Sequence, residues 1–389
     1  MHGDAFIFSI FAVFTGAAVL AGLALYARQP LLIAYIALGV LLGPWGLRWV
    51  TDPGTVAQIG EVGIVFLLFL LGLNLHPQKL VSLARQATVV TAASSVIFVA
   101  AGAGVAAAFG FDLTDSLLIG AAMMFSSTIV CLKLMPTTAL HHRHTGELVI
   151  SVLLMQDILA ILILLIIQGG GGAGSNWTDM LLGLAALPLL VAVAFGLERW
   201  VLVPVIRRFD TIQEYMFLAA IGWCLGLAQA AESLGLSYEI GAFVAGVALA
   251  SNVIARFIAE SLKPLRDFFL ILFFFSLGAG FELPMLPDVA LPAAVLALAV
   301  LAVKPVVFRW LFRITGETPT MAWEVGVRLG QASEFSLLIA FLAAETVLIG
   351  ERAGYLIQAA TLLTFIVSSY WVTLQFPTPI AVSPRLRRD

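Results

Sequence analysis

The sequence has few charged residues and almost no cysteine. Only 11% of its 389 residues are Asp, Glu, Lys or Arg, whereas 61% are hydrophobic. A soluble domain usually carries about 25% charged residues, so this balance excludes an ordinary soluble protein and indicates a polytopic membrane protein. The two cysteines, Cys131 and Cys224, both lie in apolar stretches. We interpret them as small core residues, and predict neither a disulfide nor a metal cluster.

Apolar stretches follow one another along the whole chain, separated by short loops. Because a membrane helix needs about 20 residues, the sequence predicts an all-α protein with about 13 transmembrane helices. No segment is long and polar enough for a nucleotide-binding or regulatory domain, and no basic patch indicates a nucleic-acid partner. We predict the spans at residues 5–26, 30–47, 56–74, 86–110, 115–139, 146–168, 178–206, 211–233, 236–255, 264–282, 289–313, 320–344 and 354–376.

The placement of Lys and Arg predicts the orientation. Fifteen of the 20 fall on one side, in the loops after odd-numbered spans, in the adjoining ends of spans or in the tail at 377–389. Only Arg48 and Arg352 fall on the other side, and the remaining three lie deeper within spans. Since cytoplasmic loops carry the excess of Lys and Arg, we predict an N-terminus outside and a C-terminus in the cytoplasm, in a cell (inner) membrane.

Two pairs of stretches resemble each other at an odd offset of seven spans. YIALGVLLG, from Tyr35, is similar to YEIGAFVAGVALA, from Tyr238, and VFLLFLLGLNL, from Val65, to LILFFFSLGAGFEL, from Leu270. Paired helices at an odd offset run in opposite directions, so the pattern predicts an inverted repeat. Many secondary transporters have this plan, with the site at the bilayer midplane where the halves meet.

Asp157 lies near the middle of the apolar stretch SVLLMQDILAILILLII, directly after Gln156. A carboxylate at that depth costs roughly 2.5 to 3.5 kcal/mol on insertion scales, and such residues usually pair or bind protons or ions. Asp157 is therefore the first candidate for a cation and proton site.

Two further spans contain polar residues near their middles. The fifth has Ser126, Ser127 and Thr128, and the twelfth has Gln331, Ser333 and Glu334 among others. Such residues satisfy backbone groups where a membrane helix is broken, and unwound segments form ion sites. We predict two discontinuous helices, although Ser and Thr also occur in continuous ones.

Four charged residues complete the candidate set. Lys304 lies at about the same depth as Asp157, at 1.5 Å per residue, which predicts a pair with the acid, although a lysine can also reach the membrane surface. Glu334 is interpreted as stabilising the broken segment, and Arg328 and Glu61 as accessory. The run HHRH, from His141, either senses pH or is a solvated basic loop.

Several motifs together resemble the Kef-type potassium/proton antiporters of the monovalent cation:proton antiporter-2 superfamily. The resemblance covers residues 1 to about 376 in order, and it is the combination of motifs that is specific; Gln156 beside Asp157 is the part that resembles the Kef branch. It is carried by GPWGLRWVTD, GEVGIVFLLFLLGLNLHPQKL, FSSTIV, SVLLMQDILAI, LSYEIGAFVAGVALAS, FFFSLG and GQASEFSLL.

The resemblance implies a homodimer in the lipid bilayer that works by elevator-type alternating access. Residues 1–74 and 211–282 would form the dimerisation scaffold, 86–168 and 289–376 the ion-transporting core, and 178–206 a linker. Asp157 would bind cation and proton in competition, with no cofactor.

The chain also departs from that family. Asn74 stands where the family usually has Glu, which leaves any role at that position open. Related proteins commonly carry a cytoplasmic regulatory domain that this sequence does not contain, so either a separate regulatory subunit supplies it or the chain is part of a longer protein.

The sequence thus predicts K⁺/H⁺ exchange, and a single central acid suggests one ion for one proton. Three alternatives stay open: a Na⁺/H⁺ antiporter on the same fold, a cation channel and an organic-anion symporter. No channel filter motif is present, and no hydrolytic or redox constellation indicates an enzyme.

Overall fold

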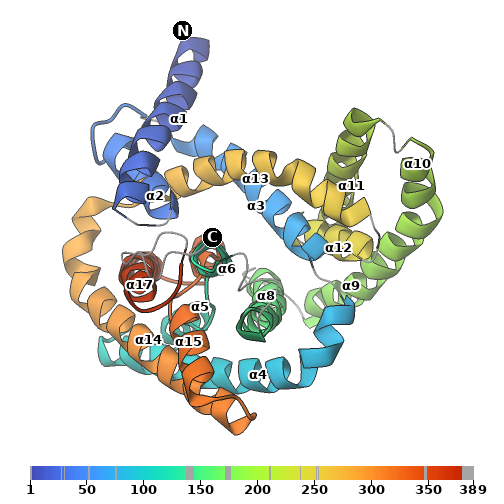
Figure 1. Ribbon diagram of the computed structural model, residues 1–389. Coiled ribbons are helices and arrows are strands. Elements are labelled where there is room, and N and C mark those ends of the chain that lie inside the picture. Colours follow the sequence, from blue (N-terminus) through green and yellow to red (C-terminus); the bar gives the residue numbers. More distant parts are fainter. Residues whose placement is uncertain are drawn as a thin grey trace. The chain divides into compact units, whose positions relative to one another are not determined.

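The computed structural model is helical, and no β-strand occurs in the part of the chain that it describes (Figure 1). The predicted all-α class is therefore confirmed. The structure describes residues 2–27, 29, 31–50, 53–74, 77–136, 144–170, 177–209, 212–236, 238–250, 252, 254–345 and 348–378. Most of the predicted tail and the first three residues of the HHRH run lie outside these ranges.

Six described helices are long and apolar enough to cross a membrane. This supports a multi-pass membrane protein, while the predicted number of spans stays a prediction. The six segments are Ile7–Tyr26, Gln86–Ala108, Ala186–Arg208, Gln213–Ser233, Leu283–Ile314 and Glu351–Gln375.

The chain divides into two compact units. Unit 1 comprises Met1–Ala17, Tyr35–Leu80 and Gln168–Gly280. Helices α1 (His2–Tyr26) and α2 (Leu31–Leu42) each have residues in both units. The other helices of unit 1 are α3 (Pro53–Asn74), α9 (Trp177–Leu197), the π-helical turn η1 (Glu198–Leu202), α10 (Val203–Arg208), α11 (Gln213–Ser233), α12 (Tyr238–Ala250) and α13 (Ile254–Ala279).

Unit 2 comprises Ala18–Ala34, Val81–Ile167 and Phe281–Asp389. It includes nearly all of both ranges predicted as the transporting core, while the predicted linker, 178–206, belongs to unit 1. The role of each unit stays a prediction. The helices of unit 2 are α4 (Pro77–Ala108), α5 (Leu113–Met123), α6 (Thr128–Lys133), α8 (His144–Gly170), the 3₁₀ turn η2 (Leu283–Met285), α14 (Leu286–Ile314), α15 (Pro319–Arg328), α16 (Glu334–Glu345) and α17 (Glu351–Gln375).

In unit 1, α3 packs closely against α12 and α13 because glycines leave room for the neighbouring backbone. A Cβ atom at Gly72 of α3 would lie 2.5 Å from the carbonyl oxygen of Phe243 in α12. A Cβ at Gly246 of α12 would meet the carbonyl oxygen of Phe69 in return. Small residues at such positions let membrane helices approach and gain van der Waals contact.

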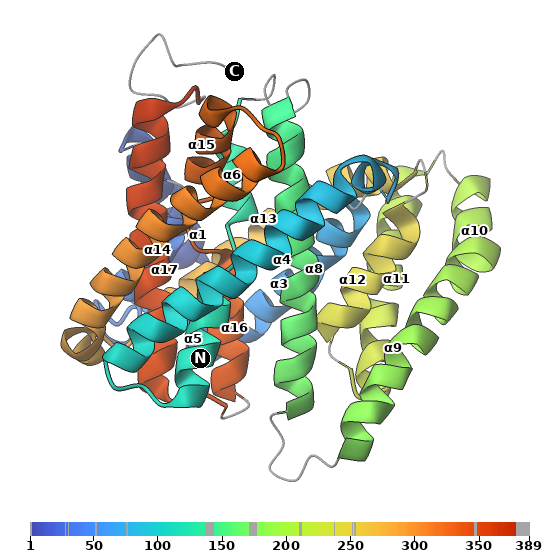
Figure 2. The same cartoon turned by 90° about the horizontal axis from the view of Figure 1, so that it is seen from below.

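In unit 2, two helical segments end before they have crossed the unit. α5 ends at Met123 and the chain resumes as α6 at Thr128, while α15 ends at Arg328 and resumes as α16 at Glu334. Figure 2 shows α5 and α16 at one level and α6 and α15 at the other. The predicted interruption of both spans is confirmed. Ser126 and Ser127 at the first break and Ser333 at the second supply polar groups of the kind that a broken helix needs.

The glycine contact in unit 1 predicts an effect of added volume. Gly246→Ala should lower the thermal unfolding midpoint in detergent, because overpacking a close contact costs about 1–3 kcal/mol. Gly222→Ala in α11 is the matched control, since a Cβ there meets nothing within 4 Å, and alanine favours a helix. An unchanged midpoint for Gly246→Ala would contradict the close packing.

Candidate cation site

The two residues singled out on α8 are both buried. Gln156 is 1% exposed and Asp157 is 2% exposed. α8 continues without interruption through this region. Asp157 therefore lies on a regular helix, whereas the irregular backbone belongs to the segments that follow α5 and α15. The site is therefore formed by one continuous helix beside two broken ones.

Gln156 uses its amide to hold the first break. Its Oε1 accepts a hydrogen bond from the backbone N–H of Ser126 at 3.0 Å, and its Nε2 donates to the carbonyl oxygen of Met124 at 3.3 Å. Both backbone groups belong to the unwound segment after α5, where no helical partner exists for them. Gln156 thus acts on the backbone of the break, a role that the sequence did not predict.

The two breaks are bonded directly to each other. The N–H of Ser127 donates to the carbonyl oxygen of Ala332 at 2.9 Å, and the hydroxyl of Ser126 donates to the carbonyl oxygen of Leu329 at 2.7 Å. The Ser127 hydroxyl accepts from the N–H of Val130 at 3.0 Å and so caps α6. The Ser126 and Ser127 hydroxyls are therefore engaged in holding the crossing.

Lys304 of α14 is fully buried and joins the two breaks. Its Nζ donates to the carbonyl oxygen of Phe125 at 2.5 Å, to that of Gln331 at 2.9 Å and to the Ser126 hydroxyl at 3.3 Å. These carbonyls follow the C-terminal ends of α5 and α15, where the helix dipole is negative. The ammonium group of Lys304 therefore donates to a carbonyl oxygen of each break and lies near the negative end of each helix dipole.

No ion pair within 4.0 Å joins Lys304 to Asp157, although the structure describes both residues. The three hydrogen-bond partners of the lysine are oxygens of the breaks instead. The pairing that equal depth predicts is therefore absent from this structure, because depth along the membrane does not determine which neighbour a side chain faces.

The second break has its own polar support. Gln331 donates from Nε2 to the carbonyl oxygen of Ser127 at 3.4 Å, and its Oε1 accepts from the hydroxyl of Ser368 at 3.0 Å. The Ser333 hydroxyl accepts from the N–H of Phe335 at 3.2 Å and donates to Glu334 at 3.4 Å. Glu334 is the first residue of α16, where a negative charge suits the helix dipole.

Two buried oxygens among the candidate residues have no hydrogen-bond partner in the described part of the chain, namely Oδ2 of Asp157 and Oγ1 of Thr128. Buried polar atoms are normally satisfied, so an unpartnered carboxylate oxygen needs an explanation such as a bound proton or cation.

The remaining two candidates lie elsewhere. Arg328, 2% exposed at the end of α15, bonds to Glu324 and donates to the carbonyl oxygens of Leu134 and Pro377 at 3.2 and 3.0 Å. It therefore ties α15 to the chain after α6 and after α17. Glu61 belongs to unit 1 and is exposed on α3.

α17 contributes polar contacts to the second break that were not predicted from the sequence. Ser368 bonds to Gln331, and the hydroxyl of Thr364 accepts from the N–H of Ala332 at 3.0 Å. The signal was present: Thr361, Thr364 and Ser368 recur at helical spacing in an apolar span, which marks one polar face.

The bonds made by Lys304 predict a stability effect. Lys304→Met should lower the unfolding midpoint clearly, because it leaves buried carbonyls unsatisfied at about 1–3 kcal/mol each. The same change at the exposed Lys263 is the matched control and should have little effect. Equal midpoints for the two variants would contradict a structural role of Lys304.

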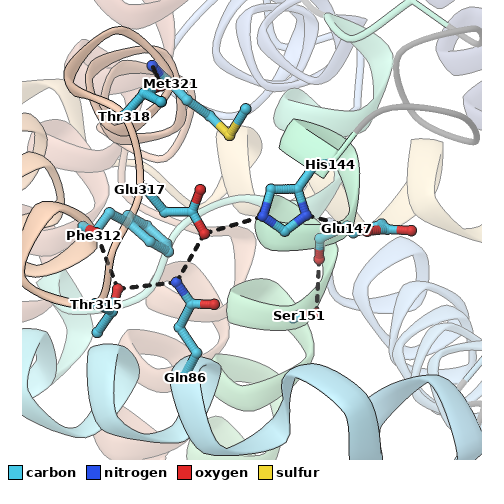
Figure 3. Close-up of polar contacts among 9 residues, drawn as sticks. All are labelled: Gln86, His144, Glu147, Ser151, Phe312, Thr315, Glu317, Thr318 and Met321. Carbon is cyan, nitrogen blue, oxygen red and sulfur yellow. Dashed lines mark hydrogen bonds and ion pairs between the residues drawn. The ribbon is translucent and has the colours of Figure 1, made fainter.

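A second polar cluster lies at the start of α8 (Figure 3). His144 contacts Glu317, in the loop between α14 and α15, at 3.0 Å through Nε2, and Glu147 at 3.3 Å through Nδ1. Gln86 of α4 donates to Glu317 at 3.1 Å and to Thr315 at 2.9 Å. Three segments are thus joined outside the apolar part of α8.

The hydrogen bond to Glu317 raises the pKa of His144, and Glu147 adds to this while partial burial opposes it. A raised pKa in the folded state means that this contact stabilises the protein fully below the unfolded pKa of about 6.5, and that the contribution is lost as the pH rises through the folded value.

His144→Gln should therefore lower the unfolding midpoint more at pH 5.5 than at pH 8.5, as measured by thermal unfolding in detergent. Glu317→Gln, which keeps His144 but removes the charge that it faces, should reduce the same pH dependence. A difference between wild type and His144→Gln that is constant across this range would show that the contact does not depend on protonation.

The fold and the site together indicate a class of protein. A buried carboxylate beside two broken helices, in a multi-pass membrane protein, is the arrangement of an ion transporter. Residues 10–376 match the family described as sodium/hydrogen exchanger, transmembrane. The chain belongs to this family, which is one of transporters and not of enzymes.

A solved structure has a similar fold. The chain is similar to the sodium proton antiporter MjNhaP1 from Methanocaldococcus jannaschii, with a TM-score of 0.72 and 15% sequence identity over 95% of this chain and 97% of that chain. At that identity the likeness shows a shared fold alone. The family match confirms the monovalent cation:proton antiporter superfamily, whereas the antiporter-2 branch and the Kef-type resemblance stay predictions.

Proposed function

We propose that this protein exchanges sodium ions for protons across a membrane and that Asp157 binds the two in turn. The observation that carries the proposal is the buried carboxylate oxygen of Asp157, which has no hydrogen-bond partner among the residues that the structure describes. Sodium is preferred because the matched family is a sodium/hydrogen exchanger family and the similar structure is that of a sodium proton antiporter.

The potassium prediction depended on Gln156, through the Kef-type resemblance. Both polar atoms of that amide are bonded to backbone groups of the first break, so its chemistry is accounted for without an ion. The sodium alternative is therefore the better supported of the two, and potassium becomes an arm of the test.

The contacts of Lys304 support a simple exchange cycle. Because its ammonium group is held by carbonyl oxygens of both breaks, it has a role that does not require it to leave when an ion binds. Only Asp157 then changes its occupant, which favours one sodium ion for one proton and no net charge movement. Thr128, whose hydroxyl is also unpartnered, is the first additional ligand to consider.

The proposal keeps several predictions from the sequence. They are a homodimer, an elevator-type movement of the core, a location in the inner membrane and an N-terminus outside. A separate cytoplasmic regulatory subunit also remains part of it.

The decisive experiment uses proteoliposomes with an internal pH dye and an imposed pH gradient. A pulse of Na⁺ should dissipate the gradient for the wild type, and Asp157→Asn should abolish the response, because an amide can neither carry the exchanged proton nor supply negative charge. Asp288→Asn, at an exposed acid in the first turn of α14, is the matched control and should remain active.

The same preparation separates the alternatives. A larger response to K⁺ than to Na⁺ would restore the potassium reading. Exchange that persists in Asp157→Asn would remove the acid from the mechanism, and a sodium-driven current of clear sign would refute electroneutral exchange.

A further inference from the structure

An open hollow lies on the outer surface of unit 2, away from the buried residues of the crossing. Its volume is about 520 Å³. Five of the lining residues recur at intervals of three and four on one face of α14, and all five are exposed. The lining consists of Val306, Arg309, Trp310, Arg313 and Ile314 of α14 and Trp323 of α15.

The hollow carries two positive charges that form no ion pair with a described acid. Arg309 and Arg313 lie one helical turn apart, and like charges at this spacing repel each other. Neither forms an ion pair within 4.0 Å with any acid that the structure describes. The Arg309 guanidinium instead lies 5.5 Å from the ring centre of Trp323, so its position is supported while its charge remains available.

An apolar stripe continues from the hollow along α14. Leu291, Leu298 and Val306 are 66%, 66% and 59% exposed, and Val295 lies between the first two on the same face. From Leu291 to Val306 the stripe is about 22 Å long at 1.5 Å per residue. This exceeds the roughly 15 Å of half a bilayer core, so it can accompany a lipid chain through a leaflet.

We propose that the hollow binds an anionic phospholipid, with the phosphate at Arg309 and Arg313 and an acyl chain along the stripe of α14. Tryptophan is typical of the membrane interface, and Trp310 and Trp323 frame the headgroup position. The basic residues place this end of α14 on the predicted cytoplasmic side, where anionic lipids attract Arg and Lys.

The lipid connects to the rest of unit 2 through α14. Lys304 lies on the opposite, buried side of this helix and holds the two breaks, and Trp323 of α15 contacts Trp371 of α17 at 6.2 Å between ring centres. A bound lipid would therefore brace α14, α15 and α17 together. Lipid binding at the hollow is independent of which cation the protein transports.

The test measures lipid binding to the purified protein in detergent, by native mass spectrometry and by the shift in unfolding midpoint. Phosphatidylglycerol should raise the midpoint of the wild type more than phosphatidylcholine does. Arg309→Gln with Arg313→Gln should remove the difference and weaken binding about 30-fold, since each basic residue near an anionic surface contributes about 1 kcal/mol. Arg207→Gln with Arg208→Gln, an exposed basic pair of α10, should keep it.

Two further measurements test whether the charge and the acyl chain are both needed for binding. Arg309→Lys with Arg313→Lys keeps the charge and should retain most of the shift, which separates loss of binding from damage to α14. Inorganic phosphate at the same concentration should have no effect, because it lacks the acyl chain. A full phosphatidylglycerol shift in the glutamine variant, or an equal shift with phosphate alone, would overturn the proposal.

Discussion

The hydrogen bonds of Lys304 are the interaction on which the core of unit 2 depends. Two helices end inside the unit, and their carbonyl ends would repel each other and lack partners. One buried ammonium group, donating to Phe125 and Gln331, satisfies an oxygen from each and lets the breaks meet. The crossing in turn leaves Asp157 beside an irregular, polar backbone instead of a uniform apolar helix surface.

Most polar side chains around the breaks bond to backbone groups. Ser126, Ser127, Gln156 and Gln331 all use their side chains on backbone groups of the breaks. In the function that we propose, these residues support the site, and the buried oxygen of Asp157 binds the proton and the cation in turn.

The sequence predicts the two helix breaks, but it does not predict which groups Lys304 and the polar face of α17 contact. The breaks could be predicted because Ser, Thr and Gln cluster near the middles of two apolar spans, and such residues satisfy the backbone groups that an interrupted helix leaves free. The partner of Lys304 could not, since depth from the membrane surface says nothing about the rotation of a helix about its axis. The contacts of Ser368 and Thr364 could not be predicted for the same reason. Their spacing indicates a polar face of α17, but it does not indicate which segment that face contacts.

The sequence by itself determined that the chain is a polytopic membrane protein, that two of its spans carry polar residues near their middles and that Asp157 lies within an apolar span. These features follow from hydropathy and from the energetic cost of polar groups in lipid, which act locally along the chain. Only the tertiary structure decided that Lys304 binds carbonyl oxygens and that Gln156 holds a break. Hydrogen bonding between distant segments depends on helix rotation and side-chain direction, which are set by packing and not by local composition.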